Sequence, residues 1–163
     1  MPFNTSSSMI GADFNTTSTT ALFALNTKAL GTGNTEWTYV KATGALLTGQ
    51  MVTIAQAGTA ILANTTALMT GSNQLGFAQG NFADQEFGWV VQRGVGVNVM
   101  CSGTAAPNAL LYLVTGSNGG ISTTAGSGTL AGIELLASAS TASLVITTAI
   151  LTYPRCTNIV SNM

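Results

Sequence analysis

The stretch FGWVVQRGVGVNVM, from Phe87 to Met100, carries the clearest strand pattern in the chain. Apolar side chains recur at every second position, and the residues between them are mostly Gly, Gln and Asn. A period of two is typical of a β-strand with one buried face. Arg93 interrupts the pattern because it falls on the apolar face. The apolar positions are Phe87, Trp89, Val91, Val95, Val97 and Val99.

The pair Arg93-Gly94 admits two explanations. A guanidinium that is buried without a partner is costly, so a turn or bulge at this pair is favoured. It divides the stretch into strands 87–92 and 95–100 and directs Arg93 outward. In the other explanation Arg93 is buried and forms a structural or intersubunit ion pair. Its candidate partners are Asp84, Glu86 and Glu134.

From Glu36 onward, short strand patterns alternate with turns that are rich in Gly and Asn. The sequence GSNGG, Gly116 to Gly120, predicts a hairpin turn because Gly and Asn tolerate positive φ. The segment from Leu144 to Tyr153 is rich in β-branched and apolar residues, and we expect it to form the last long strand. Turn signals spaced by about 8–12 residues indicate an all-β protein. We therefore expect residues 36–163 to form a single small β-barrel or β-sandwich-like domain.

Residues 1–35 have a different texture, rich in Asn, Thr and Ser, with no sustained period of two or 3.6. We interpret them as an extended N-terminal arm, since such a segment has no core of its own. Its apolar residues then become anchors on a partner surface, while a disordered tail is the alternative. The expected anchors are Phe3, Met9, Ile10, Phe14 and Phe23.

The composition is unusual because only 6% of the residues are charged although 46% are hydrophobic. Ordinary soluble domains have about a quarter of their residues charged. This balance fits a surface that is partly covered in an assembly, or an extracellular protein. A net charge of -1 without clustered Lys or Arg argues against nucleic acid as a partner. No apolar run approaches the ~18–20 residues of a spanning helix, so we expect no membrane partner.

The side chains that carry most acid–base chemistry are scarce. The chain has no histidine, which removes Ser-His-Asp and Cys-His catalysis and most zinc and haem sites. Asp84 and Glu86 stand two residues apart; a solvated loop is favoured for them, and a catalytic or Ca²⁺ pair is the alternative. We expect no enzymatic activity, no cofactor and no bound metal.

Two cysteines, Cys101 and Cys156, lie far apart in the sequence. Two reduced, partly buried thiols are favoured. A disulfide that joins the ends of two strands is the alternative, and it implies an oxidising environment or late oxidation.

Several motifs, in their order along the chain, resemble those of capsid decoration (cement) proteins of tailed bacteriophages. They begin with the strand WTYV at Trp37 and the segment GQMVTI ahead of LGFAQ. FGWVVQRG and a Gly/Val strand follow, then ALLYLVTG with its GG turn, and a last strand that ends in Tyr-Pro. The resemblance covers residues 37–155 and leaves the arm outside.

The resemblance implies a structural virion protein without catalytic residues. It implies that the protein binds the outer surface of the phage head, bridges and stabilises the major capsid protein, and assembles as a homotrimer. Its location would be the virion, after assembly in the host cytoplasm. The alternative function is a head fibre or knob module that binds host surface glycans through an exposed aromatic cluster around Tyr112 or Tyr153.

Overall fold

The computed structural model describes residues 8–9, 12–64, 74–114, 119–124 and 128–159. Within these residues the chain is almost entirely β, and the expected all-β, barrel- or sandwich-like fold class is confirmed. One short 3-10 helix, η1, spans Thr32–Asn34. The strands are β1 Ser8–Met9, β2 Ala12–Asp13, β3 Lys28–Leu30, β4 Glu36–Ala42, β5 Met51–Ile54, β6 Thr59–Leu62, β7 Gln74–Ala78, β8 Phe87–Ala105, β9 Leu111–Leu113, β10 Ile121–Ser122, β11 Gly128–Leu135 and β12 Ala139–Ile159.

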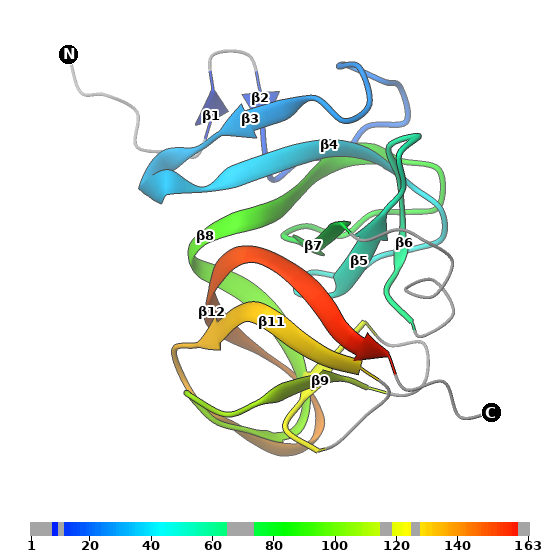
Figure 1. Cartoon of the computed structure of the whole chain (residues 1–163). Coiled ribbons are helices and arrows are strands. Elements are labelled where there is room, and N and C mark those ends of the chain that lie inside the picture. Colours follow the sequence, from blue (N-terminus) through cyan, green and yellow to red (C-terminus); the bar gives the residue numbers. More distant parts are fainter. Residues whose placement is uncertain (1–7, 10–11, 65–73, 115–118, 125–127, 160–163) are drawn as a thin grey trace.

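Strand β8 belongs to two closed circuits of hydrogen-bonded strands. The upper circuit in Figure 1 runs β8–β7–β5–β6–β4 and returns to β8. The lower circuit runs β8–β12–β11–β9–β10 and also returns to β8. The pairs β4–β6 and β10–β8 are parallel, and the other pairs in the circuits are antiparallel. Because each circuit closes on itself, most strand edges are paired, and β3 extends the sheet beyond β4.

The quoted stretch forms one continuous strand, so the expected division at Arg93-Gly94 is wrong. Two bulges lie beside that pair instead. Against β4, Arg93 pairs with Glu36 and Val91 pairs with Trp37, which leaves Gln92 as the extra residue. Against β12, a second register shift leaves Gly96 unpaired. The bulges bend β8 where it leaves one circuit and enters the other.

The second bulge changes the face of Val95. Its side chain is 62% exposed, whereas Val97 and Val99 are buried. The expectation that all three face the core therefore holds only for the last two. The extra residue at Gly96 resets the alternation, since one inserted residue moves the following side chains to the other face.

Gly94 and Gly96 permit the bend for different reasons. Gly94 has φ +148 and Gly96 has φ +75, values that side-chain-bearing residues rarely adopt. A Cβ at Gly94 would lie 2.5 Å from the Cγ2 of Thr35, while a Cβ at Gly96 would meet no atom within 4 Å. Gly94 is thus required both by its φ and by the close approach of Thr35, whereas Gly96 is favoured by its φ alone.

The interior of the upper circuit is small and aliphatic. It is formed by aliphatic residues of all five strands of the circuit, with Leu46 and Phe82 from the connecting loops. The larger cluster fills the lower circuit and continues along the opposite face of β4 and β8. That opposite face is aromatic, since Trp37, Tyr39 and Trp89 are all buried on it.

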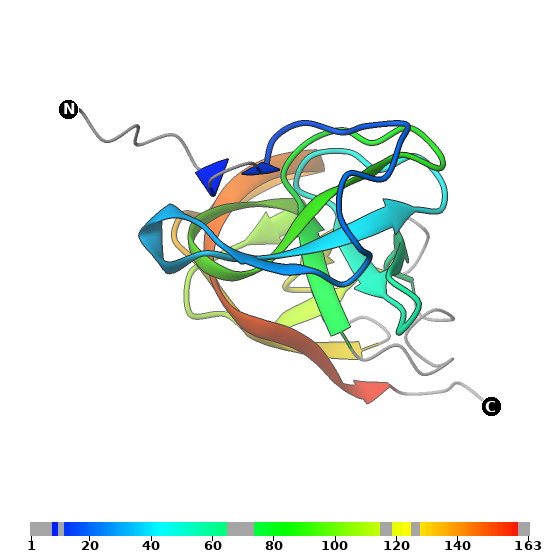
Figure 2. The ribbon, with the colours of Figure 1, turned by 90° about the horizontal axis from the view of Figure 1, so that it is seen from above.

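The segment that precedes β3 covers this aromatic face. Phe14 is 2% exposed, and its ring stacks on Trp37 with centroids 4.8 Å apart and meets Trp89 edge-on at 5.3 Å. Phe23 packs against Tyr39 at 5.2 Å. Figures 1 and 2 show the segment on the outer side of β4.

The interpretation of residues 1–35 as an arm without buried groups is therefore wrong from Phe14 onward. The rings of Trp37 and Trp89 present an apolar surface that the segment covers, and Phe14 becomes a core residue that is not free to contact a partner. Of the other expected anchors, Met9 lies on β1, which pairs with β2. Phe3 and Ile10 lie outside the described residues.

Candidate functional site

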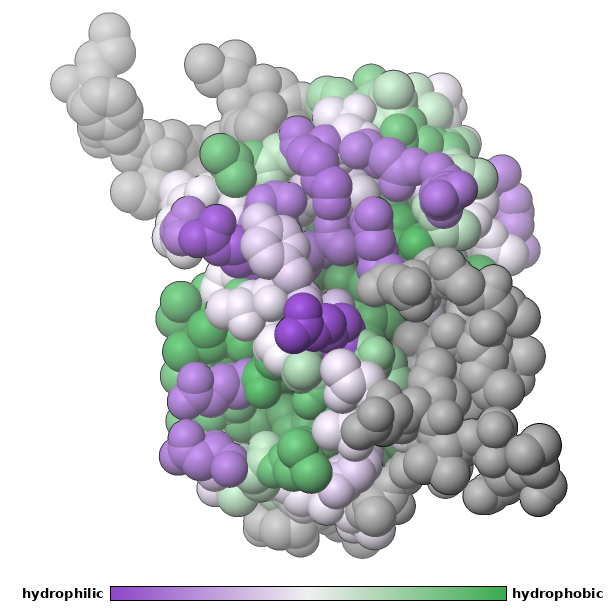
Figure 3. All heavy atoms as spheres, in the orientation of Figure 1, coloured by the Kyte–Doolittle hydropathy of each residue, from purple (hydrophilic) through white to green (hydrophobic). Residues whose placement is uncertain are grey.

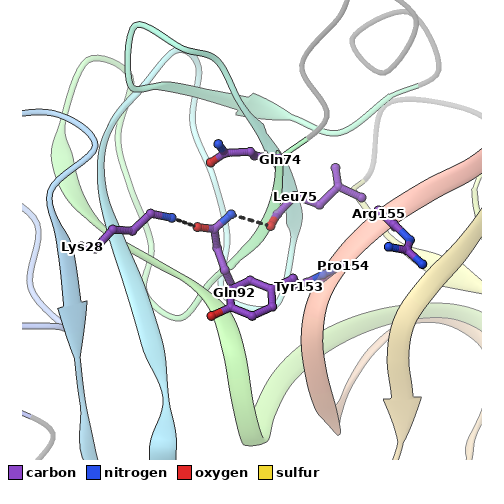
Figure 4. A pocket seen from close by; sticks show the side chains of 7 residues that line it. All are labelled: Lys28, Gln74, Leu75, Gln92, Tyr153, Pro154 and Arg155. Carbon is purple, nitrogen blue, oxygen red and sulfur yellow. Dashed lines mark hydrogen bonds between the residues drawn. The ribbon is translucent and has the colours of Figure 1, made fainter.

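A hollow of about 360 Å³ opens beside the bend of β8. Strands β3, β7, β8 and β12 meet around it, so residues that are far apart in the sequence share one wall (Figure 4). The lining residues are Lys28, Gln74, Leu75, Gln92, Tyr153, Pro154 and Arg155.

The inserted residue Gln92 forms the floor of the hollow and is 4% exposed. Its Oε1 accepts hydrogen bonds from the Lys28 ammonium and from the Thr38 hydroxyl, the latter at 2.5 Å. Its Nε2 donates to the Leu75 carbonyl at 3.1 Å. Both the oxygen and the nitrogen of the buried amide are thus engaged, which fixes its orientation and that of Lys28.

Lys28 and Glu36 form an ion pair at the rim, with Nζ and Oε1 3.9 Å apart. Burial lowers the pKa of Lys28 below its usual value, and the neighbouring Glu36 carboxylate raises it again in part. The Lys28 side chain is 46% exposed, so solvent screens this pair. The Lys28 side chain lines the hollow.

Tyr153 is held in an unusual position. Its φ is +54, a region that residues other than Gly rarely adopt. Its hydroxyl donates to Glu36 Oε2 at 2.5 Å, and the Arg93 guanidinium lies over its ring, 6.0 Å from the centroid. These contacts place a half-exposed ring at the mouth of the hollow.

Arg93 is partly buried against Tyr153 and pairs across the strands with Glu36. The ion pair found within the described residues joins Lys28 and Glu36 instead. The alternative prediction of an Arg93 ion pair within the chain is therefore wrong for its named partners, Asp84, Glu86 and Glu134. The ring of Tyr153 offers the guanidinium a cation–π contact in their place.

Most of the positive charge of the chain gathers around the hollow. Lys28 and Arg155, two of its four cationic residues, line the hollow and give the lining a charge of +2, and Arg93 lies over the ring of the lining residue Tyr153. The other charged residues, Lys41 and Arg93 with the five acidic residues, sum to 2 − 5 = −3. The hollow is thus a cationic site in an acidic protein.

A second surface is the outer face of β12 and its neighbours, called here the apolar face. Along β12 the side chains of Ala149 and Leu151 are buried. The alternate positions of the strand, which include Leu144 and Ile146, therefore point outward. Figure 3 shows a hydrophobic area over the lower circuit. The apolar face consists of Val95 (62% exposed), Leu136 (46%), Leu144 (42%) and Ile146 (50%).

Asp84 and Glu86 shape their own loop. Asp84 Oδ1 accepts from the Gly44 amide at 2.6 Å, and this bond, with those from Gln85, lowers the pKa of Asp84. Glu86 Oε2 accepts from the Ala83 amide at 2.8 Å. No group of three or more potential metal ligands occurs among the described residues. The loop interpretation accounts for both carboxylates.

Both cysteines are free thiols, as the favoured interpretation predicts. Cys101 is buried, and burial raises its pKa to about 11. Burial also raises the pKa of Cys156. A raised pKa keeps a thiol protonated and weakly nucleophilic at neutral pH.

Sequence reasoning identified Arg93 but missed Lys28, Gln92 and Arg155 as members of one site. The only sequence signal that could have pointed to Lys28 and Arg155 was that the chain has just four cationic residues. Tyr153 is exposed, yet within the described residues neither it nor Tyr112 takes part in a ring pair. The expected aromatic cluster around these tyrosines is therefore not found there.

No helix in the described part of the chain has the length and apolar character needed to cross a membrane. Comparisons with protein-family models, curated proteins and solved structures found no match in any of the three.

Proposed function

We propose that this chain is a capsid decoration protein. It binds the outside of a tailed-phage head, bridges and stabilises neighbouring major capsid proteins, and acts as a homotrimer. The proposal begins with the order of motifs between residues 37 and 155, and its mechanism is binding rather than chemistry.

The observation that carries the proposal is the apolar face. Its four large aliphatic side chains, on β8, on β12 and just after β11, are each at least 42% exposed. Such a patch on a β-sheet marks an interaction surface or an aggregation hazard. Since charged residues make up only 6% of the chain, charge gives little protection from aggregation. If a capsid protein or a sister subunit covers the apolar face, these side chains are removed from solvent and the hazard of aggregation is lowered.

Binding to shells tests the proposal. Purified protein is mixed with undecorated heads from the phage genome that encodes it, and occupancy is measured by co-sedimentation. We expect saturable binding, and Ile146→Lys should weaken it about tenfold or more because a charge is placed in an apolar contact. Leu22→Lys is the matched control, since Leu22 is 68% exposed in the segment that covers β4, away from the apolar face. Wild-type protein that fails to bind the heads would refute the proposal.

Sedimentation tests the homotrimer separately. We expect the isolated protein to sediment as a trimer at micromolar concentration, and Ile146→Lys to shift it toward monomer if the apolar face joins the subunits. A clean monomer that still binds heads would assign the apolar face to the capsid alone.

The alternative, a head module that binds host glycans, draws on one observation. Tyr153 is 49% exposed and borders a hollow with polar neighbours such as Gln74 and Lys28. Binding to a glycan array that Tyr153→Ala abolishes would support this alternative. Loss of head stability when the protein is omitted favours decoration.

A further inference from the structure

We propose that the cationic hollow is a binding site for a carboxylate, supplied by an Asp or Glu side chain on a partner polypeptide. The inference rests on the proposed function only for the partner, which would be a capsid protein or a sister subunit. Carboxylate binding itself follows from the residues of the hollow.

The charge distribution is the first argument. The hollow carries a local charge of +2 while the rest of the chain carries −3. A chain with so few charged residues has no general need of surface cations. Their concentration near one hollow favours a positive local potential on an acidic protein, and such a potential attracts anions.

Arg155 is the second argument. It is exposed at the hollow, and within the described residues its guanidinium has no hydrogen-bond or ion-pair partner. A guanidinium offers a planar fork of donors that matches a carboxylate in two parallel hydrogen bonds. Figure 4 shows Arg155 on β12 to one side of the Gln92 amide and Lys28 on β3 to the other.

The fixed floor is the third argument. Lys28 donates to Gln92 and Thr38, so its ammonium is held in place before any ligand arrives. Gln92 is itself held by the Leu75 carbonyl. A cation that is already ordered loses little entropy when an anion binds. Lys28 thus supplies the electrostatic field, and Arg155 supplies the free hydrogen-bond donors.

Three features favour a protein carboxylate over other anions. Glu36 already accepts a hydrogen bond from the Tyr153 hydroxyl beside the hollow, which shows that a carboxylate is compatible with these neighbours. A local charge of +2 suits a monoanion better than a polyphosphate. Tyr153 has no aromatic partner among the described residues, and Arg93 lies over its ring, which leaves a poor stacking platform for a sugar.

The hollow complements the apolar face. Both lie along β12, the apolar face at Leu144 and Ile146 and the hollow at Tyr153 to Arg155. Apolar contact supplies affinity without direction, whereas a charge pair sets register and orientation. A partner that contacts both surfaces would therefore be aligned by one acidic residue.

The test uses the whole isolated protein and two capped peptides, N-acetyl-Gly-Glu-Gly-amide and the same peptide with Gln. Titrations are followed by the amide and side-chain NMR signals of Gln74, Gln92 and Arg155. We expect saturable shifts with the Glu peptide and none with the Gln peptide. Arg155→Gln should weaken binding about tenfold. Lys41→Gln removes the same charge away from the hollow and should leave binding unchanged.

Several outcomes would overturn the inference. They are the absence of saturable shifts, equal shifts with both peptides, and equal losses in Arg155→Gln and Lys41→Gln. Inorganic phosphate that binds more tightly than acetate would make the hollow a phosphate site. Glucuronate that binds more tightly than the Glu peptide would point to acidic sugars. Each assigns the hollow to another ligand or to none.

The two proposals fail separately. Heads that bind the wild-type protein and Arg155→Gln equally well, together with Glu-peptide binding, would keep decoration and place the carboxylate on a sister subunit or another partner. Peptide binding by a protein that never binds heads would keep the hollow and refute decoration.

Discussion

Phe14 is the residue on which the N-terminal segment depends. Its ring lies between Trp37 and Trp89 and is 2% exposed. Its place in the core could not be read from the sequence, because Phe14 sits among Asn and Thr residues with no periodic pattern. Only the pairing of β4 with β8 creates the aromatic surface that it covers.

Truncating this ring should be costly. We expect Phe14→Ala to lower the free energy of unfolding by about 3 kcal/mol, because it leaves a cavity between two indole rings. Urea unfolding measures the change. Leu22→Ala, at a side chain that is 68% exposed, should cost at most about 0.5 kcal/mol. Equal effects of the two substitutions would mean that the segment does not hold its place on β4.

Cys101 makes stability depend on pH in the alkaline range. Its pKa is about 11 in the folded protein against 9.0 in the unfolded chain. The unfolded thiol therefore ionises first, so the stabilisation is complete below pH 9.0 and is lost as the pH rises toward 11. We expect a loss of up to about 2 kcal/mol. Thermal unfolding of wild type and Cys101→Ala from pH 7 to 11 should show a shallower slope for the variant.

At the scale of elements, local patterns were predicted well. The alternation of EWTYVKA coincides with β4, the quoted stretch begins at the first residue of β8, and Leu144 to Tyr153 lies inside β12. Strands β9 and β10 pair as a hairpin around GSNGG, although most of that turn lies outside the described residues. Each of these depends on residues that are neighbours in the sequence.

The bulges and the hollow were not predictable in the same way. A bulge is defined by the partner strand, and β8 changes partners near Gln92 and Gly96. The hollow joins Lys28 to Gln92, which are 64 residues apart. Periodicity reports which face is apolar, but it does not report which strands will meet.

The two glycines of the bend should respond differently to alanine. Gly96→Ala adds strain from a positive φ but no clash, and we expect a cost of about 1 kcal/mol. Gly94→Ala also drives a Cβ to 2.5 Å from Thr35 and should cost about 2–3 kcal/mol. Chemical unfolding measures both. A smaller loss at Gly94 than at Gly96 would show that Thr35 does not approach Gly94 closely.

At the scale of the whole molecule, a capsid contact by residues 1–11 can be tested without disturbing the core. We expect deletion of residues 1–11 to keep stability within about 0.5 kcal/mol, because Phe14 is retained. If Phe3, Met9 and Ile10 contact the capsid, as the sequence predicts, the same deletion lowers head occupancy. Deletion of residues 1–20 also removes Phe14 and should destabilise the fold. Full occupancy after the shorter deletion would exclude capsid contacts by these residues.

The shared strand β8 has a consequence for how the molecule opens. Neither circuit can lose β8 without breaking the other, so the two halves should exchange their core amide hydrogens through the same global unfolding. We expect Val90 in the upper circuit and Val99 in the lower circuit to show opening free energies within about 1 kcal/mol of each other. Native-state hydrogen exchange in low denaturant measures both. The small barrel-like halves would then behave as one cooperative unit, with no partly open intermediate in which a single half persists.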